Sequence, residues 1–397
     1  MVNHAAQHLH RPGARVPGRI RTMNANDEIS LTRDLLQLDT INPPGNERDC
    51  ARRIGRLLED WGYAVSYYEH ADQRTSVIAR LGGTDAKAPL CLTGHIDTVP
   101  LGAAKWSHDP FSGETDGDKL YGRGSSDMKA GVAGILIAAK NLAGHLRPTA
   151  GVVIVLTAAE EGGCIGSKHM IQVEGLLGRA GAMVVGEPTS NYPAVGHKGS
   201  MKFWAKFRGV TAHGSMPHLG VNAIYKAAHA ACKIEKFEFH DHPHPVMGGP
   251  SINVGMFHAG QTINSVPDEA VLGVDVRSIV GMDHAVVLKR LRDLLGDEAE
   301  LDVFQDMPAV WTEPEHAWMQ RVFEICAKTL NEKPEPRTVS YNSDAGNFLK
   351  TWRGAPTVIL GPGEPSMAHQ TDEYCRMSRI RESVAIYEDI IRDWCGV

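Results

Sequence analysis

The segment Leu90–Pro100 holds the first residues of the chain whose types and spacing could do chemistry. An apolar run ends at Gly94 and is followed by His95 and Asp97, two side chains that can bind a metal ion. Residues two positions apart in a strand face the same side, so these two groups can point into one pocket. A single His-x-Asp triplet often arises by chance, and it gains weight here because similar groups recur along the chain.

The recurring groups stand where predicted strands end. They are Asp127, Glu160, Glu161, Glu187 and His369. In open α/β sheets the carboxyl ends of the strands form the edge at which ligands bind. Carboxylates gathered at one edge repel one another and are costly to bury unpaired, and a divalent cation removes that conflict. Because the ligands offer only nitrogen and oxygen, the set suits Zn²⁺, Co²⁺ or Mn²⁺.

The segments that must position these groups alternate between two kinds of pattern. Continuous apolar runs at Gly151–Leu156 and Ala182–Val185 are typical of strands buried on both faces. Amphipathic or apolar helical patterns lie between the strands, at 27–39, 47–61 and 128–142. This alternation predicts an α/β fold with a mostly parallel sheet and helices on both faces.

The pattern changes after about Tyr192. Alternating strands are expected at 200–207, 251–257 and 270–277, and helices at 221–236 and 282–295. Such an order is typical of an inserted α+β domain, with an antiparallel sheet and two helices. We therefore expect a metal-binding domain from residues 23–192 and 309–397, and an inserted second domain from residues 193–308.

Bulk properties exclude several classes of protein. A length of 397 residues is enough for two domains, and the net charge of −6 argues against a nucleic-acid surface. No apolar run approaches the roughly 18–20 residues that span a membrane. Residues 1–22 lack the apolar core of a secretory signal, so we expect a disordered leader, with a transit peptide as the alternative. Seven cysteines without a Cys-x-x-Cys motif indicate reduced thiols in a cytoplasmic protein.

Taken in order, these motifs resemble the M20 metallopeptidase family, which includes acetylornithine deacetylase, succinyl-diaminopimelate desuccinylase, aminoacylase and the glutamate carboxypeptidases. The resemblance extends from about Leu31 to the C-terminus. The matching segments are Gly94–Pro100, Leu120–Lys129, Glu160–Gly162, Gly186–Thr189, and Gly361–Gly363 with Ala368–Tyr374. Two of them look most like the acetylornithine deacetylase branch, whereas residues 340–347 depart from it and leave the amino-acid side chain of the substrate open.

The resemblance implies two divalent metal ions per subunit, with zinc as the first choice and cobalt or manganese as alternatives. Asp127 would bridge the two ions. His95 and Glu187 would complete the ligands of one ion, and Glu161 and His369 those of the other.

Two further residues would support the chemistry. Asp97 would hold the second ring nitrogen of His95 and fix its tautomer. Glu160 would remain free of metal and act as general base towards a metal-bridging hydroxide. The resemblance also implies a cis peptide bond between Asp127 and Met128.

Residues outside the metal ligands would bind the substrate. The resemblance implies that His213 reaches the active site of a partner subunit and stabilises the developing oxyanion, and that Asn264 and Arg277 hold the carboxylate end of the substrate. Ser343 and Gly363 lie in segments expected near the substrate. The resemblance thus makes residues 193–308 a lid or dimerisation domain and residues 23–192 and 309–397 the catalytic metal-binding domain. It implies a homodimer formed through the inserted domain.

Together the sequence predicts a dinuclear metal-dependent amidohydrolase that cleaves the amide bond of a small N-acyl amino acid. A dipeptidase or carboxypeptidase, or an aminohydrolase that releases ammonia, could use the same site. A non-catalytic binding protein of the same fold is the alternative from another class, and the presence of Glu160 beside a complete ligand set argues against it. No nucleic-acid or membrane partner is expected.

Overall fold

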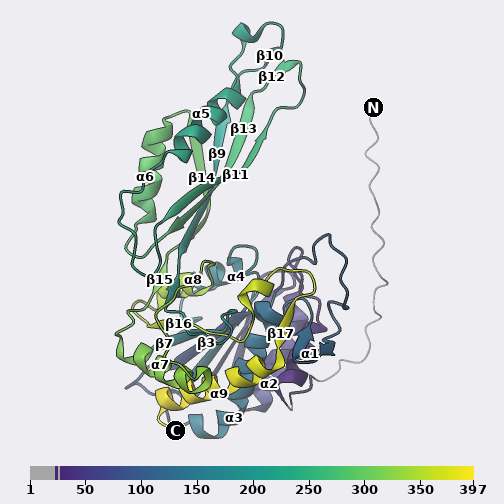
Figure 1. Cartoon of the computed structure of the whole chain (residues 1–397), viewed down its shortest axis with the longest axis vertical. Helices are drawn as coiled ribbons and strands as arrows, with labels where there is room; N and C mark the ends of the chain where they lie inside the picture. The colour runs from purple at the N-terminus through teal and green to yellow at the C-terminus, as the bar shows by residue number, and fades with distance from the viewer. Residues whose placement is uncertain (1–22, 26) are drawn as a thin grey trace.

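Six strands form the sheet on which the candidate site residues depend. The computed structural model describes residues 23–25 and 27–397, so the predicted leader, 1–22, lies outside the described residues. The sheet has the order β1-β2-β6-β3-β7-β16 (Figure 1). The bounds are Ala64–Ala71 for β1, Arg74–Leu81 for β2, Leu90–His95 for β3, Val152–Thr157 for β6, Ala182–Val185 for β7 and Thr357–Ile359 for β16. Strands β6 to β16 run parallel, and β2 and β1 add an antiparallel edge.

Helices cover both faces of this sheet, as the sequence predicts. Ile154 of β6 packs on one face against a core that includes α1, α2, α3, α7 and α9. Its neighbour Val155 faces the other side, where Met170 of α4 and Phe348 of α8 close a second core. The bounds are Glu28–Leu36 for α1, Glu47–Asp60 for α2, Ala130–Leu146 for α3, Ile165–Met170 for α4, Ala317–Leu330 for α7, Ala345–Thr351 for α8 and Met377–Cys395 for α9. None of the helices in the described ranges is long and apolar enough to cross a membrane.

A small three-stranded sheet, which the sequence patterns do not predict, lies beside the start of α3. Its order is β17-β5-β4, with β4 at Thr115–Asp116, β5 at Lys119–Tyr121 and β17 at Tyr374–Arg376. This pairing brings the C-terminal motif next to the irregular turn Ser125–Lys129, which leads into α3. The predicted helix 128–142 therefore begins two residues later than expected, because the chain at Asp127 and Met128 is not helical.

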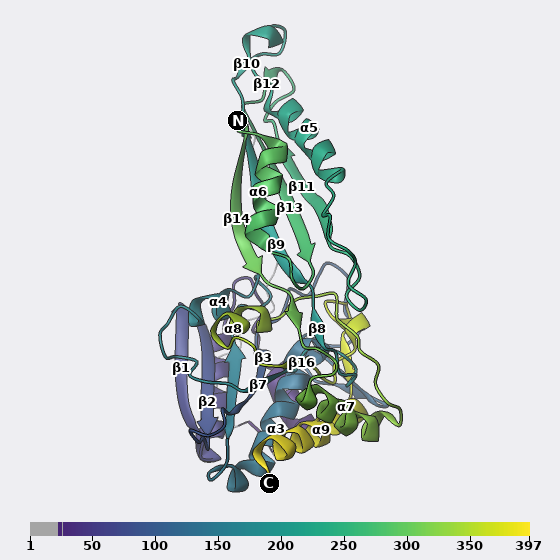
Figure 2. The ribbon, with the colours of Figure 1, turned by 90° about the vertical axis from the view of Figure 1, so that its left-hand side faces the viewer.

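A second, antiparallel sheet stands apart from the first (Figures 1 and 2). Its order is β11-β13-β9-β14, and α5 and α6 cover one of its faces with a core that includes Phe203 and Leu272. The bounds are Gly199–Arg208 for β9, Ser251–Ala259 for β11, Glu269–Ser278 for β13, Ala299–Met307 for β14, Ala223–Glu235 for α5 and His284–Leu295 for α6. This is the predicted α+β pattern, while the boundaries at residues 193 and 308 stay a prediction.

The four-stranded sheet together with α5 and α6 is called the second unit. Short elements lie at its two ends. At its base, β8 (Gly196–His197) pairs with β15 (Val310–Trp311), where the chain enters and leaves. At its far tip, β10 (Ala212–His213) pairs with β12 (Ser265–Val266), and Figure 1 shows this pair at the end remote from the six-stranded sheet. Three-residue helices lie at Pro217–Leu219 and Pro365–Met367.

Gly131 lets α3 lie directly against the end of β7. A Cβ atom added there would lie 2.1 Å from the carbonyl oxygen of Gly186, whereas one added at Gly144, in the same helix, would meet nothing within 4 Å. We expect Gly131→Ala to lower the free energy of unfolding by about 1–3 kcal/mol through overpacking. Gly144→Ala is the matched control and should raise it by about 0.5–1 kcal/mol. Urea unfolding measures both, and equal effects would contradict this account of the helix contact.

Candidate active site

The predicted ligands converge at the carboxyl ends of three neighbouring parallel strands. His95 is the last residue of β3, Glu160 and Glu161 follow β6, and Glu187 follows β7. Since the sheet order is β6-β3-β7, these ends lie side by side. The two remaining ligands, Asp127 and His369, come from the turn before α3 and the loop before β17. A cavity of about 410 Å³ opens over the group.

Asp127 lies between two pairs of potential ligands. Its Oδ1 is 3.0 Å from Nε2 of His95, and its Oδ2 is 3.4 Å from Nε2 of His369. Glu187 Oε1 lies 4.0 Å from the same His95 nitrogen, and Glu161 Oε2 lies 3.1 Å from the His369 nitrogen. Each oxygen of Asp127 therefore faces its own histidine and glutamate, which is the arrangement that a carboxylate between two cations requires.

The donor atoms suit divalent cations. Ligand atoms of His95, Asp127 and Glu161 lie within 4.8 Å of one another. Among the described residues, Oε1 of Glu161 is buried and has no hydrogen-bond partner. Buried polar atoms in proteins are nearly always paired, so this oxygen is available to a further ligand such as a cation. Imidazole nitrogens and carboxylate oxygens are ligands for zinc and for harder divalent ions.

The protonation of the site reflects its crowding. Burial raises the pKa of both Glu161 and Glu187, and the nearby charge of Asp127 raises each further. Hydrogen bonds to Asp127 and Glu161 raise the pKa of His369 to about 10. Burial opposes protonation of His95, but the carboxylates around it outweigh that effect and raise its pKa. The protons on the two imidazoles thus offset carboxylate charge that a bound cation would otherwise neutralise.

Asp97, which is predicted to hold the second ring nitrogen of His95, lies beside that nitrogen but directs its hydrogen bonds elsewhere. The Nδ1 atom of His95 lies 2.9 Å from the backbone carbonyl oxygen of Asp97, whereas the carboxylate oxygen is 3.6 Å from it. The carboxylate accepts hydrogen bonds from the backbone N–H groups of Glu160, at 3.0 Å, and Glu161, at 3.1 Å, and from Asn42 Nδ2, at 2.9 Å. Those N–H groups lie beyond the end of β6 and need an acceptor. Asp97 therefore holds the glutamate pair in place.

Glu160 lies in the cavity wall with only 8% of its surface exposed. Burial raises its pKa, and the charges of Asp344 and Glu161 add to the shift. The thiol of Cys164 donates a hydrogen bond to its Oε1 at 3.0 Å. No hydrogen bond or ion pair joins Glu160 to His95 or His369 in the part of the chain that the structure describes. A buried carboxyl group beside a ligand cluster is suited to taking and returning a proton.

Glu373 is a positioning residue that the sequence reasoning missed. Its carboxylate accepts hydrogen bonds from the backbone N–H groups of Gly124, Ser126 and Asp127, at 2.8–2.9 Å, and from Arg123 at 2.6 Å. The peptide bond between Asp127 and Met128 is cis, as the family resemblance implies. Glu373 lies within the matching C-terminal segment, but only the pairing of β17 with β5 reveals which loop it holds.

Arg277 is the predicted substrate-binding residue that the structure brings to the cavity. It reaches the cavity wall from β13 and contacts the carboxylate of Asp275 at 3.0 Å and Oδ1 of Asn342 at 3.3 Å. These two neighbours orient a planar guanidinium that can bind a carboxylate through two parallel hydrogen bonds.

Ser343 and Gly363, which are predicted to bind substrate, do not line the cavity. Ser343 is fully buried, and its hydroxyl lies 3.1 Å from Nε2 of His197. A Cβ atom at Gly363 would lie 2.1 Å from the carbonyl oxygen of Ser126. Close packing beneath the Asp127 turn therefore explains the glycine, and the neighbouring residue Asn342 lines the cavity in place of Ser343.

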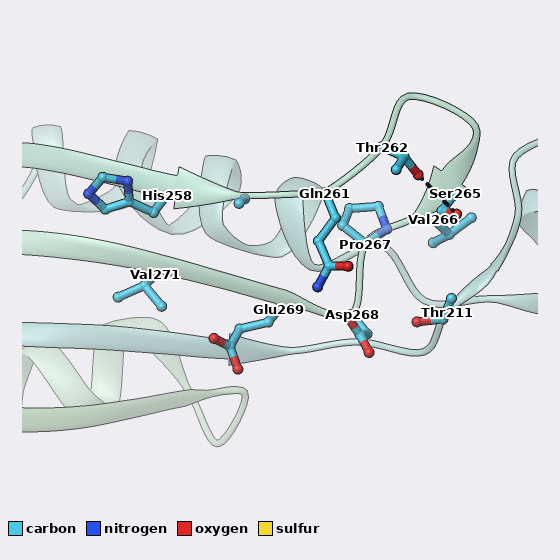
Figure 3. A pocket seen from close by; sticks show the side chains of 12 residues that line it. Thr211, His258, Gln261, Thr262, Ser265, Val266, Pro267, Asp268, Glu269 and Val271 are labelled. Atoms are coloured by element: carbon cyan, nitrogen blue, oxygen red, sulfur yellow. Dashed lines mark hydrogen bonds between the residues drawn. The ribbon is translucent and has the colours of Figure 1, made fainter. Parts of the chain in front are cut away.

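His213 and Asn264 lie together at the exposed tip of the second unit, far from the ligand cluster of the same chain. The N–H of Gly214 donates to the carbonyl oxygen of Asn264 at 2.8 Å. A cavity of about 280 Å³ opens beside β12 near this tip, and Figure 3 shows Gln261 and Glu269 among its lining residues. In the described ranges, the one ligand cluster of metal-binding geometry is that at His95.

Comparison with known proteins agrees with the fold described above. The sequence model of Peptidase family M20/M25/M40 matches residues 91–393. The chain belongs to this family. Like its relatives, this M20 protein is a hydrolase of amide bonds, and the family depends on metal.

Similar proteins include deacylases and peptidases. The chain is 30% identical to an acetylornithine deacetylase of Vibrio campbellii over 358 residues, which cover 86% of this chain and 90% of that one. It is 27% identical to a "Probable succinyl-diaminopimelate desuccinylase" of Staphylococcus epidermidis, covering 93% and 98% of the two chains. The M20 family metallo-carboxypeptidase Sso-CP2 from Sulfolobus solfataricus has the same fold, with a TM-score of 0.75 at 19% identity, covering 92% and 99%.

We expect Glu373→Gln to weaken metal binding about 10–100-fold, the usual cost of losing a residue that orients a ligand. Glutamine has one acceptor oxygen, whereas in the wild type three backbone N–H groups and Arg123 share the two oxygens of the Glu373 carboxylate. Asp372→Asn is the control, because Asp372 binds the N–H of Ser107 and not the Asp127 turn. Competition with a chelating dye measures both variants, and equal affinities would contradict the role of Glu373.

Metal affinity should fall as the pH is lowered. In the metal-free protein the pKa of His369 is raised to about 10 and that of His95 is raised well above its usual value, so these imidazoles hold protons that a cation must displace. The raised pKa values of Glu161 and Glu187 extend this competition between protons and cation to higher pH. Metal binding therefore releases protons, and the apparent affinity should rise about tenfold per pH unit for each proton released. Calorimetry in buffers of different ionisation enthalpy measures that number, and an affinity independent of pH would contradict the charge distribution described above.

Proposed function

We propose that this M20 hydrolase removes the acyl group from a small N-acyl amino acid, with two divalent cations, zinc as the first choice. The observation that carries the proposal is the position of Asp127, whose two oxygens face two separate histidine–glutamate pairs. Glu160 and Arg277 line the same cavity. Its volume of about 410 Å³ is in the range of small-molecule sites.

The protein groups divide the work of amide hydrolysis. Arg277, held by Asp275 and Asn342, would bind the carboxylate of the amino acid and so orient the scissile amide. Glu160 would take a proton from the attacking water and deliver it to the leaving nitrogen. Divalent cations, when bound, would lower the pKa of water and polarise the carbonyl group.

A substrate panel tests the reaction class. We expect the zinc-, cobalt- or manganese-loaded enzyme to hydrolyse N-acetyl amino acids faster than dipeptides with the same C-terminal residue. Faster cleavage of dipeptides would show that the enzyme is a dipeptidase and not a deacylase. If neither class of substrate releases ammonia, an aminohydrolase acting on these substrates is excluded.

Glu160→Gln should bind metal as the wild type does but lose turnover by about 10²–10⁴, the scale of general acid–base catalysis. The substitution keeps the size of the side chain and removes the group that accepts the proton. Glu174→Gln, at an exposed position in the loop after α4, is the control. Metal analysis and steady-state kinetics measure both, and near-normal turnover of a metal-loaded Glu160→Gln enzyme would rule out this role.

We further propose that two copies associate through the second unit. Strand β11 is an open edge of the sheet. Near the tip, apolar side chains are exposed at Val210, Met216, Leu219, Val221, Tyr225 and Ile263. Unpaired edges and exposed apolar groups of this kind favour association. In such a dimer His213 would stabilise the oxyanion in the site of the neighbouring subunit.

Mixed dimers test this role of His213. A donor aimed at an oxyanion is typically worth about 10²–10³ in rate, so His213→Ala alone should lose that much without losing metal. A dimer of one His213→Ala subunit and one Glu160→Ala subunit should regain about half of the wild-type activity, because one site keeps both groups. Kinetics on purified mixed dimers, with composition checked by mass, measure this, and an inactive mixed dimer would exclude action across the interface.

A further inference from the structure

Lys202 brings an uncommitted positive charge to the candidate active site. It lies on β9, and its side chain lines the same cavity as Asp127, Glu160 and Arg277. Within the described part of the chain its ammonium group takes part in no hydrogen bond or ion pair. The other lysine on this face, Lys206, is instead paired with Asp302 at 2.8 Å.

Gln305 adds an unused donor next to this charge. Only 6% of the residue is exposed, and it lines the same cavity, yet its Nε2 atom is buried without any hydrogen-bond partner among the described residues. Buried amide groups without partners are rare and costly. The amide lies close to the loop that follows the glutamate pair, since a Cβ atom at Gly163 would be 3.2 Å from Gln305 Oε1.

The sheet places these two donors side by side and apart from Arg277. Gln305 of β14 is directly opposite Lys202 of β9 in the antiparallel register, so both side chains lie on the same face. Arg277 belongs to β13, on the other side of β9. Neighbouring strands are about 4.8 Å apart, so the backbones that carry Lys202 and Gln305 lie one and two strand spacings from β13, roughly 5 and 10 Å.

We propose that Lys202 and Gln305 form a specificity subsite for a second carboxylate of the substrate, separate from the one that Arg277 would bind. This inference rests on the proposed function and narrows the substrate class to N-acyl amino acids with two carboxylates. The second carboxylate belongs either to the amino-acid side chain or to a dicarboxylic acyl group. Both sources present the same chemistry to an ammonium and an amide N–H.

Two matched pairs of substrates test the subsite and distinguish its sources. N-acetylglutamate is compared with the isosteric N-acetylglutamine, and N-succinylalanine with its terminal amide. We expect the metal-loaded enzyme to prefer one diacid over its amide about 10- to 100-fold in kcat/KM, as a hydrogen bond to a charged group predicts. The pair that shows the preference identifies whether the side chain or the acyl group carries the second carboxylate.

Variants then assign the preference to these residues. In Lys202→Met the ratio of kcat/KM for the diacid to kcat/KM for its amide should fall to near one, mainly through a higher KM for the diacid. Lys202→Gln is the substitute should the methionine variant fold poorly. Gln305→Leu should reduce it in part. Lys206→Met, four residues along the same strand and paired outside the cavity, should leave the preference intact.

Calorimetric binding of glutarate, compared with glutaramate, gives a readout that does not depend on turnover. Tighter binding of glutarate to the wild type, lost in Lys202→Met and retained in Lys206→Met, supports the subsite. If N-acyl amino acids are hydrolysed but neither diacid is preferred, or if Lys202→Met changes diacid and amide equally, the subsite is wrong and the proposed function stands. If no N-acyl amino acid is hydrolysed, the proposed function fails, and equal binding of glutarate and glutaramate would then overturn the subsite as well.

Discussion

The structure depends on holding several carboxylates together at one edge of a sheet. Asp127, Glu160, Glu161 and Glu187 all reach the cavity wall, where burial penalises their charged forms. In the absence of cations, two protonated histidines offset part of that charge. Such an arrangement is costly to fold around and is retained because the same charges bind and activate something else. The protein therefore gives up stability at this edge in exchange for affinity towards cations.

The remaining parts of the catalytic unit keep that edge in place. Asp97 and Glu373 are also buried carboxylates, but each accepts hydrogen bonds from backbone N–H groups. Asp97 fixes the segment after β6, and Glu373 fixes the turn before α3. Because these segments are irregular, they lack the hydrogen bonds of a strand or helix, and an acidic side chain supplies the missing acceptor. The positions of the candidate ligands are thus set by acidic groups whose oxygens accept hydrogen bonds from the backbone.

The sequence predicted those parts of the site that follow from regular structure. His95, Glu160 and Glu187 could be placed together because strand patterns identify where β3, β6 and β7 end. The two-part fold followed from the change of periodicity near Tyr192. The roles of Asp97 and Ser343 could not be predicted, because they depend on which way a loop carbonyl or amide turns, and residue spacing carries no information on that. His213 and Asn264 lie far from the cluster in one chain, and only their family resemblance connects them to it.

The paired strands β8 and β15 suggest how this architecture could be rearranged. Val310 lies directly opposite His197, so the chain leaves the second unit beside the point where it entered. Adjacent ends make a unit exchangeable, because a short turn could join them without disturbing the six-stranded sheet. The cavity wall formed by β9, β13 and β14 could therefore be replaced as one block on an unchanged metal-binding edge. Lys202, Arg277 and Gln305, which line the cavity, thus come from a different stretch of the gene than the histidines and carboxylates at the strand ends.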